Sequence, residues 1–128
     1  MPHTYEWAVL RVVPRVERAE FVNAGVVVYC QVLDFLGARV HLDLERLAAI
    51  DPSVDVAAVE RHLDSVRALC AGEPSAGANG ARPPGERFRW LVAPRSTVVQ
   101  PSGVHAGLTD DPAAELDRLL TRMVLPPA

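Results

Sequence analysis

The sequence contains no lysine, so all thirteen of its basic side chains are arginine. Arginine is the better bidentate phosphate binder, and its abundance alone would suggest anion recognition. The chain is also rich in alanine, valine, proline and glycine, whose codons are GC-rich like most arginine codons. Genome composition explains the bias at least as well as chemistry does. Only the position of an arginine, and not the number of arginines, is therefore informative.

Cysteine is scarce, and long apolar runs are absent. Cys30 and Cys70 lie in no CxxC or CxxH context, which favours two small buried residues in a reducing compartment. The longest apolar run, 24–30, is far shorter than the ~20 residues that cross a bilayer. Residues 1–6 show no basic or apolar region of a signal peptide. These features predict a cytoplasmic protein without a membrane partner.

Composition places the chain among globular proteins of one domain. Hydrophobic residues make up 49% and charged residues 23% of the 128 positions, which allows a single core. The formal net charge of −3 argues against a broad basic face that holds nucleic acid. The composition leaves a homo-oligomer open.

Apolar, β-branched segments predict three consecutive strands. Residues 5–13 and 21–33 form two such segments on either side of a short charged stretch. Residues 34–37 begin with Asp and end with Gly, as type I turns do, so 38–44 should fold back as a third, antiparallel strand.

Two helices are predicted. The first begins after Asp55, a good N-cap, presents apolar residues at three- and four-residue spacing, and ends at Gly72. The second begins at Asp111 and Pro112 and stops before Pro126. Each helix has one apolar stripe, so both are expected on one face of the sheet.

The region between these helices predicts a loop and two further strands. Residues 72–86 contain no large apolar side chain, which indicates a flexible surface loop. Residues 87–93 place Phe88, Trp90 and Val92 at alternate positions, as a strand does, and 97–101 continues as an extended segment.

The predicted fold is therefore a single α+β domain over residues 1–128, in the order βββα, loop, ββα. Its mainly antiparallel sheet has about five strands, two helices cover one face, and the flexible loop lies at about 72–86.

The predicted hairpin suggests one catalytic arrangement. If 34–37 is the turn, Cys30 lies opposite His41 with Asp43 nearby, which would supply a nucleophile, a base and an orienting acid. The alternative is that Cys30 is a strand residue packed in the core and that His41 is an ordinary histidine at the rim of the sheet. That alternative is favoured, because a register error of one residue would move the two side chains to opposite faces. No residue is therefore predicted to be catalytic.

Arginines at special positions suggest an anion site. Arg11 lies within an apolar strand, Arg15 follows a proline that ends this strand, and Arg95 and Ser96 follow another proline. A half-buried arginine needs either a carboxylate or a bound anion. The acids nearby in the sequence favour structural ion pairs. If instead the arginines form one site, Arg15 and Arg95 should approach one another or share an anion or a carboxylate.

Motifs for metals and cofactors are missing. The four histidines have neither the helical spacing nor the cysteine pairs of a zinc site. No glycine-rich phosphate loop lies between a strand and a helix, and no serine lies in a nucleophile elbow. We therefore predict no metal and no cofactor.

Two blocks of the sequence carry a family resemblance. The first is YEWAVLRVVPR at 5–15 followed by EFVNAGV at 20–26, and the second is WLVAPRS at 90–96 followed by QPS at 100–102 and TDDP at 109–112. Together they resemble the bacterial DUF3037 family, which has no established activity and no assigned catalytic residues. Members are often encoded beside a HipA-like kinase, a class that includes toxins of toxin–antitoxin systems.

The resemblance implies a non-enzymatic accessory or protein-interaction domain, the partner of a HipA-like kinase in a toxin–antitoxin-like or regulatory pair. The alternative is a small enzyme or an anionic-ligand-binding protein with a site around Arg11, Arg15 and Arg95. A large apolar patch on the surface would favour the first function. A deep polar pocket with perturbed ionisable groups would favour the second.

Overall fold

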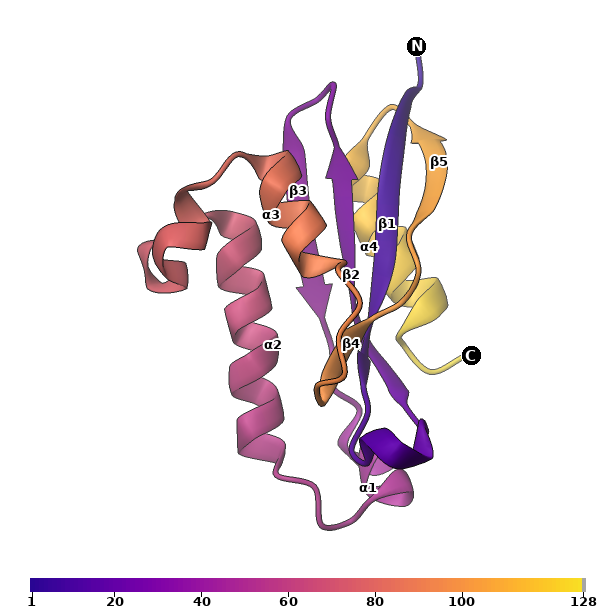
Figure 1. The fold of residues 1–128 in the computed structure, drawn as a ribbon. Coiled ribbons are helices and arrows are strands. Elements are labelled where there is room, and N and C mark those ends of the chain that lie inside the picture. Colours follow the sequence, from indigo (N-terminus) through magenta and orange to yellow (C-terminus); the bar gives the residue numbers. More distant parts are fainter. Residues whose placement is uncertain (128) are drawn as a thin grey trace.

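The structure, a computed structural model, describes residues 1–127 and contains a five-stranded antiparallel sheet between two layers of helices (Figure 1). The strands are β1 (His3–Val12), β2 (Val22–Cys30), β3 (Phe35–Val40), β4 (Val99–Pro101) and β5 (His105–Thr109). The α-helices are α1 (Leu44–Ile50), α2 (Val56–Ala71), α3 (Pro84–Leu91) and α4 (Pro112–Met123), and the 3₁₀ helices are η1 (Val16–Arg18) and η2 (Pro74–Ala81). The predicted single-domain α+β class with about five antiparallel strands is confirmed.

Strand β1 is the centre of the sheet. The order is β3-β2-β1-β4, and β5 pairs with the first half of β1 while β4 pairs with its end. Ser102 joins these two short strands, because its backbone N–H donates to Val9 O at 2.8 Å and its hydroxyl accepts from Val9 N at 2.8 Å. The side chain thus replaces a missing backbone partner, and one edge of β1 is covered by two strands in succession.

The helices lie on both faces of the sheet, not on one face as predicted. Leu116 and Leu119 of α4 pack with Val26 on one face. Phe88 of α3 and Leu69 of α2 pack on the opposite face. Figure 1 shows α3 in front of the sheet, α2 beside it at the left and α4 behind it. The prediction was wrong because both faces of the central strands are apolar, and an apolar face requires its own cover.

The predicted hairpin register is also wrong. The turn is formed by residues 31–34, and Cys30 pairs with Phe35 rather than with His41, a difference of six residues along β3. Asp34 adopts the left-handed conformation, with φ 51°, which Asp tolerates better than most residues. A shift by an even number of residues leaves the alternation of the two faces unchanged, so the apolar pattern alone cannot detect it.

Residues 87–93, predicted as a strand, instead belong mainly to α3. Pro83 is the N-cap and Pro84 the first helical residue, a position where proline is favoured. Phe88 is fully buried, whereas Trp90 is 54% exposed. In a strand these two side chains would share a face, and the helix separates them.

The segment between α2 and α3 is held by several contacts. Gly72 ends α2 with φ 68°, as predicted. Arg87 donates through Nη1 to Gly80 O at 3.4 Å, and a Cβ atom at position 72 would lie 2.4 Å from the same nitrogen. The flexibility predicted for 72–86 stays a prediction, but its last residues, from Pro84, are the first turn of α3. Among residues 1–127, no helix has the length and apolar character needed to cross a membrane.

The helical assignment of α3 predicts different effects for its two large aromatic residues. Phe88→Ala should lower the free energy of unfolding by about 3–5 kcal/mol, because it empties a fully buried site. Trp90→Ala should lower it by less than about 1 kcal/mol, since much of the ring is exposed. Urea unfolding of both variants checks this difference. Equal losses would indicate that the two rings share a buried face, as in a strand.

The contact between Arg87 and the end of α2 predicts a second pair of effects. Gly72 and Gly77 both have positive φ, but only Gly72 has Arg87 above it, and nothing lies within 4 Å of a Cβ at Gly77. Gly77 has φ 72° and ψ −152°, a conformation almost restricted to glycine, so Gly77→Ala should cost about 1–3 kcal/mol from the backbone alone. Gly72→Ala should lower the free energy of unfolding by more than the about 1–2 kcal/mol of a left-handed alanine, because it also displaces the guanidinium. A thermal-unfolding loss no larger than this backbone penalty would mean that Arg87 does not hold this segment.

Candidate functional site

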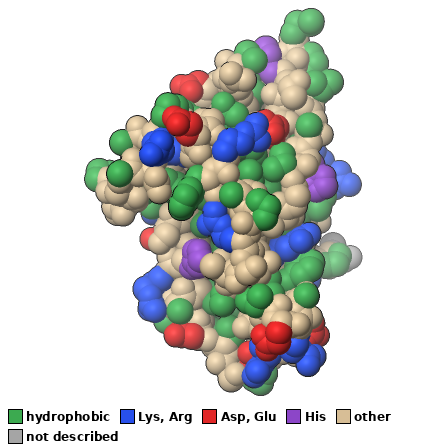
Figure 2. Space-filling view, in the orientation of Figure 1, with side chains coloured by type: hydrophobic (Ala, Val, Ile, Leu, Met, Phe, Trp, Pro, Cys, Tyr) green, Lys and Arg blue, Asp and Glu red, His purple; other side chains and the backbone are tan. Residues whose placement is uncertain are grey.

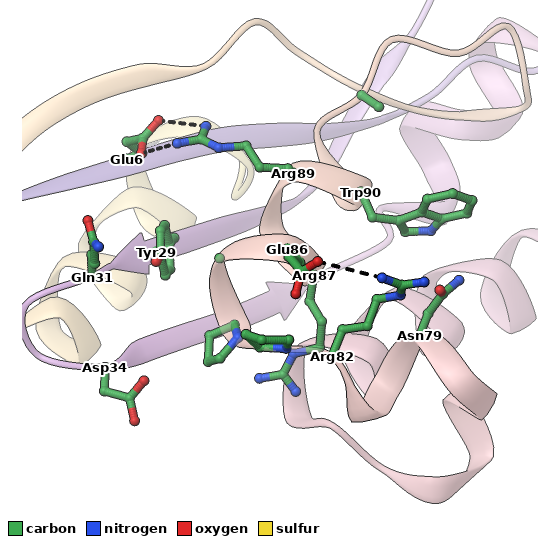
Figure 3. Close-up of a pocket in the computed structure, with 14 residues that line it drawn as sticks. Glu6, Tyr29, Gln31, Asp34, Asn79, Arg82, Glu86, Arg87, Arg89 and Trp90 are labelled. Atoms are coloured by element: carbon green, nitrogen blue, oxygen red, sulfur yellow. Dashed lines mark hydrogen bonds and ion pairs between the residues drawn. The ribbon is translucent and has the colours of Figure 1, made fainter.

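A cleft with a volume of about 840 Å³ lies beside α3. It is lined by side chains of β1, the end of β2, the turn after β2, η2 and α3 (Figure 3). Its lining residues are Glu6, Tyr29, Gln31, Asp34, Asn79, Arg82, Pro83, Pro84, Gly85, Glu86, Arg87, Arg89, Trp90 and Ala93. We call this surface the α3 cleft.

The packing of α3 explains which side chains reach the cleft. Phe88 and Leu91 point into the core, so the intervening Arg89 and Trp90 point outward. The Phe88 ring also stacks on Tyr29, with 5.2 Å between the ring centroids. Gly85 lies directly over Tyr29, because a Cβ atom there would be 2.8 Å from the phenol oxygen. The close approach of α3 to β2 therefore fixes the floor of the cleft.

Two ion pairs cross the α3 cleft. Arg89 binds both carboxylate oxygens of Glu6, at 2.9 and 2.7 Å, which ties α3 to β1 and raises the pKa of Arg89. Arg82 lies 3.5 Å from Glu86 across one helical turn. Figure 3 shows both pairs, with Trp90 beside them. Both arginines and Glu86 are more than half exposed, and Glu6 is 28% exposed, so each pair contributes little to stability.

Trp90 is the most exposed aromatic side chain of the cleft. Its ring is 54% exposed, and the guanidinium of Arg95 lies 5.7 Å from its centroid. Arg95 also donates to the carbonyl oxygens of Trp90 and Ala93, at the C-terminal end of α3. A cation at this end of a helix is stabilised by the helix dipole. Arg95 is thereby held by the backbone of α3.

A second cavity, of about 630 Å³, lies between the start of α2 and residues 96–99. Two residues of the arginine site predicted from the sequence, Ser96 and Arg15, lie at or next to this cavity. Ser96 lines it directly, and Asp51, which also lines it, pairs with Arg15 at 3.3 Å. Hydrogen bonds from Ser53 and the charge of Arg15 lower the pKa of Asp51. His62 lines the same cavity, and burial, together with the charge of Arg95, lowers its pKa.

The arginines proposed for an anion site thus have separate neighbours. Arg15 pairs with a carboxylate, and Arg95 binds backbone carbonyls, so the two do not share a carboxylate among residues 1–127. Neither arginine lines the second cavity itself, but each acts on a residue that does: Arg15 pairs with Asp51, and the charge of Arg95 acts on His62. Arg11 lies elsewhere, at the end of β1, over the ring of Phe21.

The structure does not assemble the cysteine–histidine dyad. Cys30 is fully buried, and its sulfur contacts Thr4 O at 3.6 Å, whereas His41 is exposed beyond the end of β3. The reason is the register difference in the hairpin. Burial raises the pKa of the other cysteine, Cys70, to about 12, so this thiol stays protonated at neutral pH.

Sequence reasoning missed the α3 cleft. Its central ion pair joins Glu6 to Arg89 across 83 residues, so no local pattern indicates it. The available signal was the helix start at Pro83 and Pro84, which would have placed the neighbouring arginines on a helix. Among residues 1–127, no group of three or more His, Cys, Asp or Glu side chains is placed to hold a metal ion.

The second cavity yields a prediction for His62. Arg95→Gln should raise its pKa, because a nearby positive charge is removed, but the pKa should stay below the ordinary value, since burial is the larger cause. NMR titration of the imidazole ring measures this shift, and Arg15→Gln is the control that should leave it unchanged. Because the pKa of His62 is lowered in the folded state, the unfolded chain binds the imidazole proton more readily. The contribution of His62 therefore lowers the free energy of unfolding as the pH falls below about 6.5. An unaltered titration in Arg95→Gln would contradict the electrostatic coupling.

Comparison with known proteins places the chain in a family. The sequence model described as "Protein of unknown function (DUF3037)" matches residues 7–124, which is nearly the whole chain. No curated protein and no solved structure matches it. The match includes β1 from Trp7 onward, β2, α3 and α4, which frame the sheet and the α3 cleft. The chain belongs to the DUF3037 family.

Proposed function

We propose that this protein is a non-enzymatic interaction domain that binds a partner protein through the α3 cleft. The observation that carries the proposal is the chemistry of the cleft lining. The lining combines Trp90 and Tyr29 with three arginines, and contains no Ser, Thr, Cys, His or Lys. It is therefore suited to recognition, and it lacks the Ser, Cys, Lys and His side chains that most often act as nucleophiles and bases.

The lining has the composition of a binding hot spot. Trp, Tyr and Arg dominate the binding energy at protein interfaces, because each combines a large apolar surface with directional hydrogen bonds. Trp90 offers an exposed ring, and Arg82 and Arg89 are more than half exposed on either side of it. A partner segment that covers the ring would also exclude water from these ion pairs and strengthen the electrostatic attraction within them.

The acids of the cleft do not form a catalytic pair. Both oxygens of Glu6 are bound by Arg89, and Glu86 lies beside Arg82. Asp34 is exposed on the hairpin turn. A general base or nucleophile must be free to reach a substrate atom. The paired carboxylates support binding over turnover.

The proposed partner is a HipA-like kinase, in a toxin–antitoxin-like or regulatory pair. Its identity rests on the resemblance to DUF3037 proteins, which are often encoded beside such a kinase. An interaction domain in the cytoplasm would meet this partner directly. The alternative function, an enzyme or anion-binding protein around Arg11, Arg15 and Arg95, has less support, because two of these arginines already have partners within the chain.

The test is calorimetric titration with the kinase-like product of the adjacent gene. Trp90→Ala should weaken binding at least tenfold, equivalent to about 1.4 kcal/mol, because it removes the central exposed ring. Leu108→Ala is the matched control: this side chain is 65% exposed but lies on β5, outside the cleft lining. It should leave the affinity unchanged, as should Cys30→Ala.

Two results would overturn the proposal. One is equal loss of affinity in Trp90→Ala and Leu108→Ala, which would move the interface away from the α3 cleft. The other is no binding at about 10–100 μM together with a hydrolytic or transfer activity that a single substitution abolishes. The second result would support the enzyme alternative instead.

A further inference from the structure

Arg11 differs from the other half-buried arginines. Three arginines are partly buried, and two of them bind backbone carbonyls: Arg87 binds Gly80 O, and Arg95 binds the end of α3. Arg11 has no hydrogen bond and no ion pair with any residue in the range 1–127, and its Nε atom, like that of Arg87, is fully buried without a partner. Such a group normally carries a desolvation penalty that a bound partner removes.

The guanidinium of Arg11 is oriented by an aromatic ring. Its central carbon lies 4.3 Å from the centroid of the Phe21 ring, within cation–π distance. Phe21 is itself 43% exposed and lies immediately before β2. Stacking on one face leaves the edge of the guanidinium free for in-plane hydrogen bonds, the geometry in which arginine binds carboxylate and phosphate.

The neighbours of Arg11 on the sheet do not neutralise its charge. It pairs with Asn23 on β2 and with Gln100 on β4, both uncharged. Their amide groups are already held, because Asn23 Nδ2 donates to Met123 O at 2.9 Å and Gln100 Nε2 donates to Thr97 O at 2.8 Å. The Oδ1 atom of Asn23 is buried and unpartnered, like the Nε atom of Arg11.

We infer that the terminal nitrogens of Arg11 bind an oxyanion, either a carboxylate or a phosphate, at the end of β1. The two Nη atoms are the donors of Arg11 that are not fully buried, and the Phe21 ring lies against the guanidinium. This site is separate from the α3 cleft, because Arg11 does not line it. It goes beyond the proposed partner interaction and does not depend on it.

The experiment compares thermal unfolding in sodium chloride, sodium acetate and sodium phosphate at one pH and one ionic strength. Phosphate, acetate or both should raise the melting temperature of the natural protein above its value in chloride by at least about 2 °C. Arg11→Met should lose this difference. Arg61→Met is the matched control, since Arg61 is exposed and has no ion pair among residues 1–127. It should keep the full anion response.

A direct measurement covers the case in which Arg11→Met unfolds. Titration of the natural protein with phosphate or acetate should shift the NMR resonance of the Arg11 Nε–H group more than that of any other arginine. A response to both anions identifies a general oxyanion site, and a response to phosphate alone identifies a phosphate site. The inference is overturned if Arg11→Met and the natural protein respond equally, or if the Arg11 resonance does not move. Trp90→Ala should keep the anion response. A negative result in the anion test therefore leaves the partner-binding proposal unaffected, and a negative result in the partner-binding test leaves the anion site unaffected.

Discussion

The arrangement of the molecule depends on β1 being buried on both faces. Tyr5 and Val9 point to the α4 side, and Leu10 and Val12 point to the α2 side, with at most 7% exposure each. Strands β2, β4 and β5 all pair with this strand, so a displacement of β1 would disturb the pairing of all three. Two apolar faces require two helical layers. The α3 cleft exists because one of these layers ends in a short helix placed over β2.

Local signals predicted the elements that local chemistry determines. Asp55 and Asp111 each accept a hydrogen bond from a backbone N–H three residues later, so their helices begin where the sequence indicates. The hairpin register and the identity of α3 were not predictable in this way. A register shift of six residues preserves the apolar alternation, and a short stretch with several apolar residues, such as 88–92, fits either a strand or a short helix.

The candidate site was predictable only in part, for a related reason. The sequence indicated that Arg11 needs a partner, and the structure leaves that need unmet among residues 1–127. It did not indicate that Arg15 would meet Asp51, because these residues come together through the loop after α1. The pairing of Glu6 with Arg89 likewise depends on how α3 packs over the sheet. Tertiary contacts of this kind can be predicted only when the positions of the helices relative to the sheet are known.

The arginines illustrate why position matters more than number in a chain without lysine. Arg87 lies at the end of α2, Arg95 at the end of α3, and Arg46 donates to Val124 O at the end of α4. A guanidinium has five donors and no acceptor, so it satisfies helix-end carbonyls while its charge opposes the helix dipole. Contacts within the chain explain the positions of these three arginines without a bound anion. An argument for an anion site must therefore rest on an arginine that no carbonyl and no carboxylate of the chain explains, and Arg11 is the half-buried arginine of residues 1–127 that meets this condition.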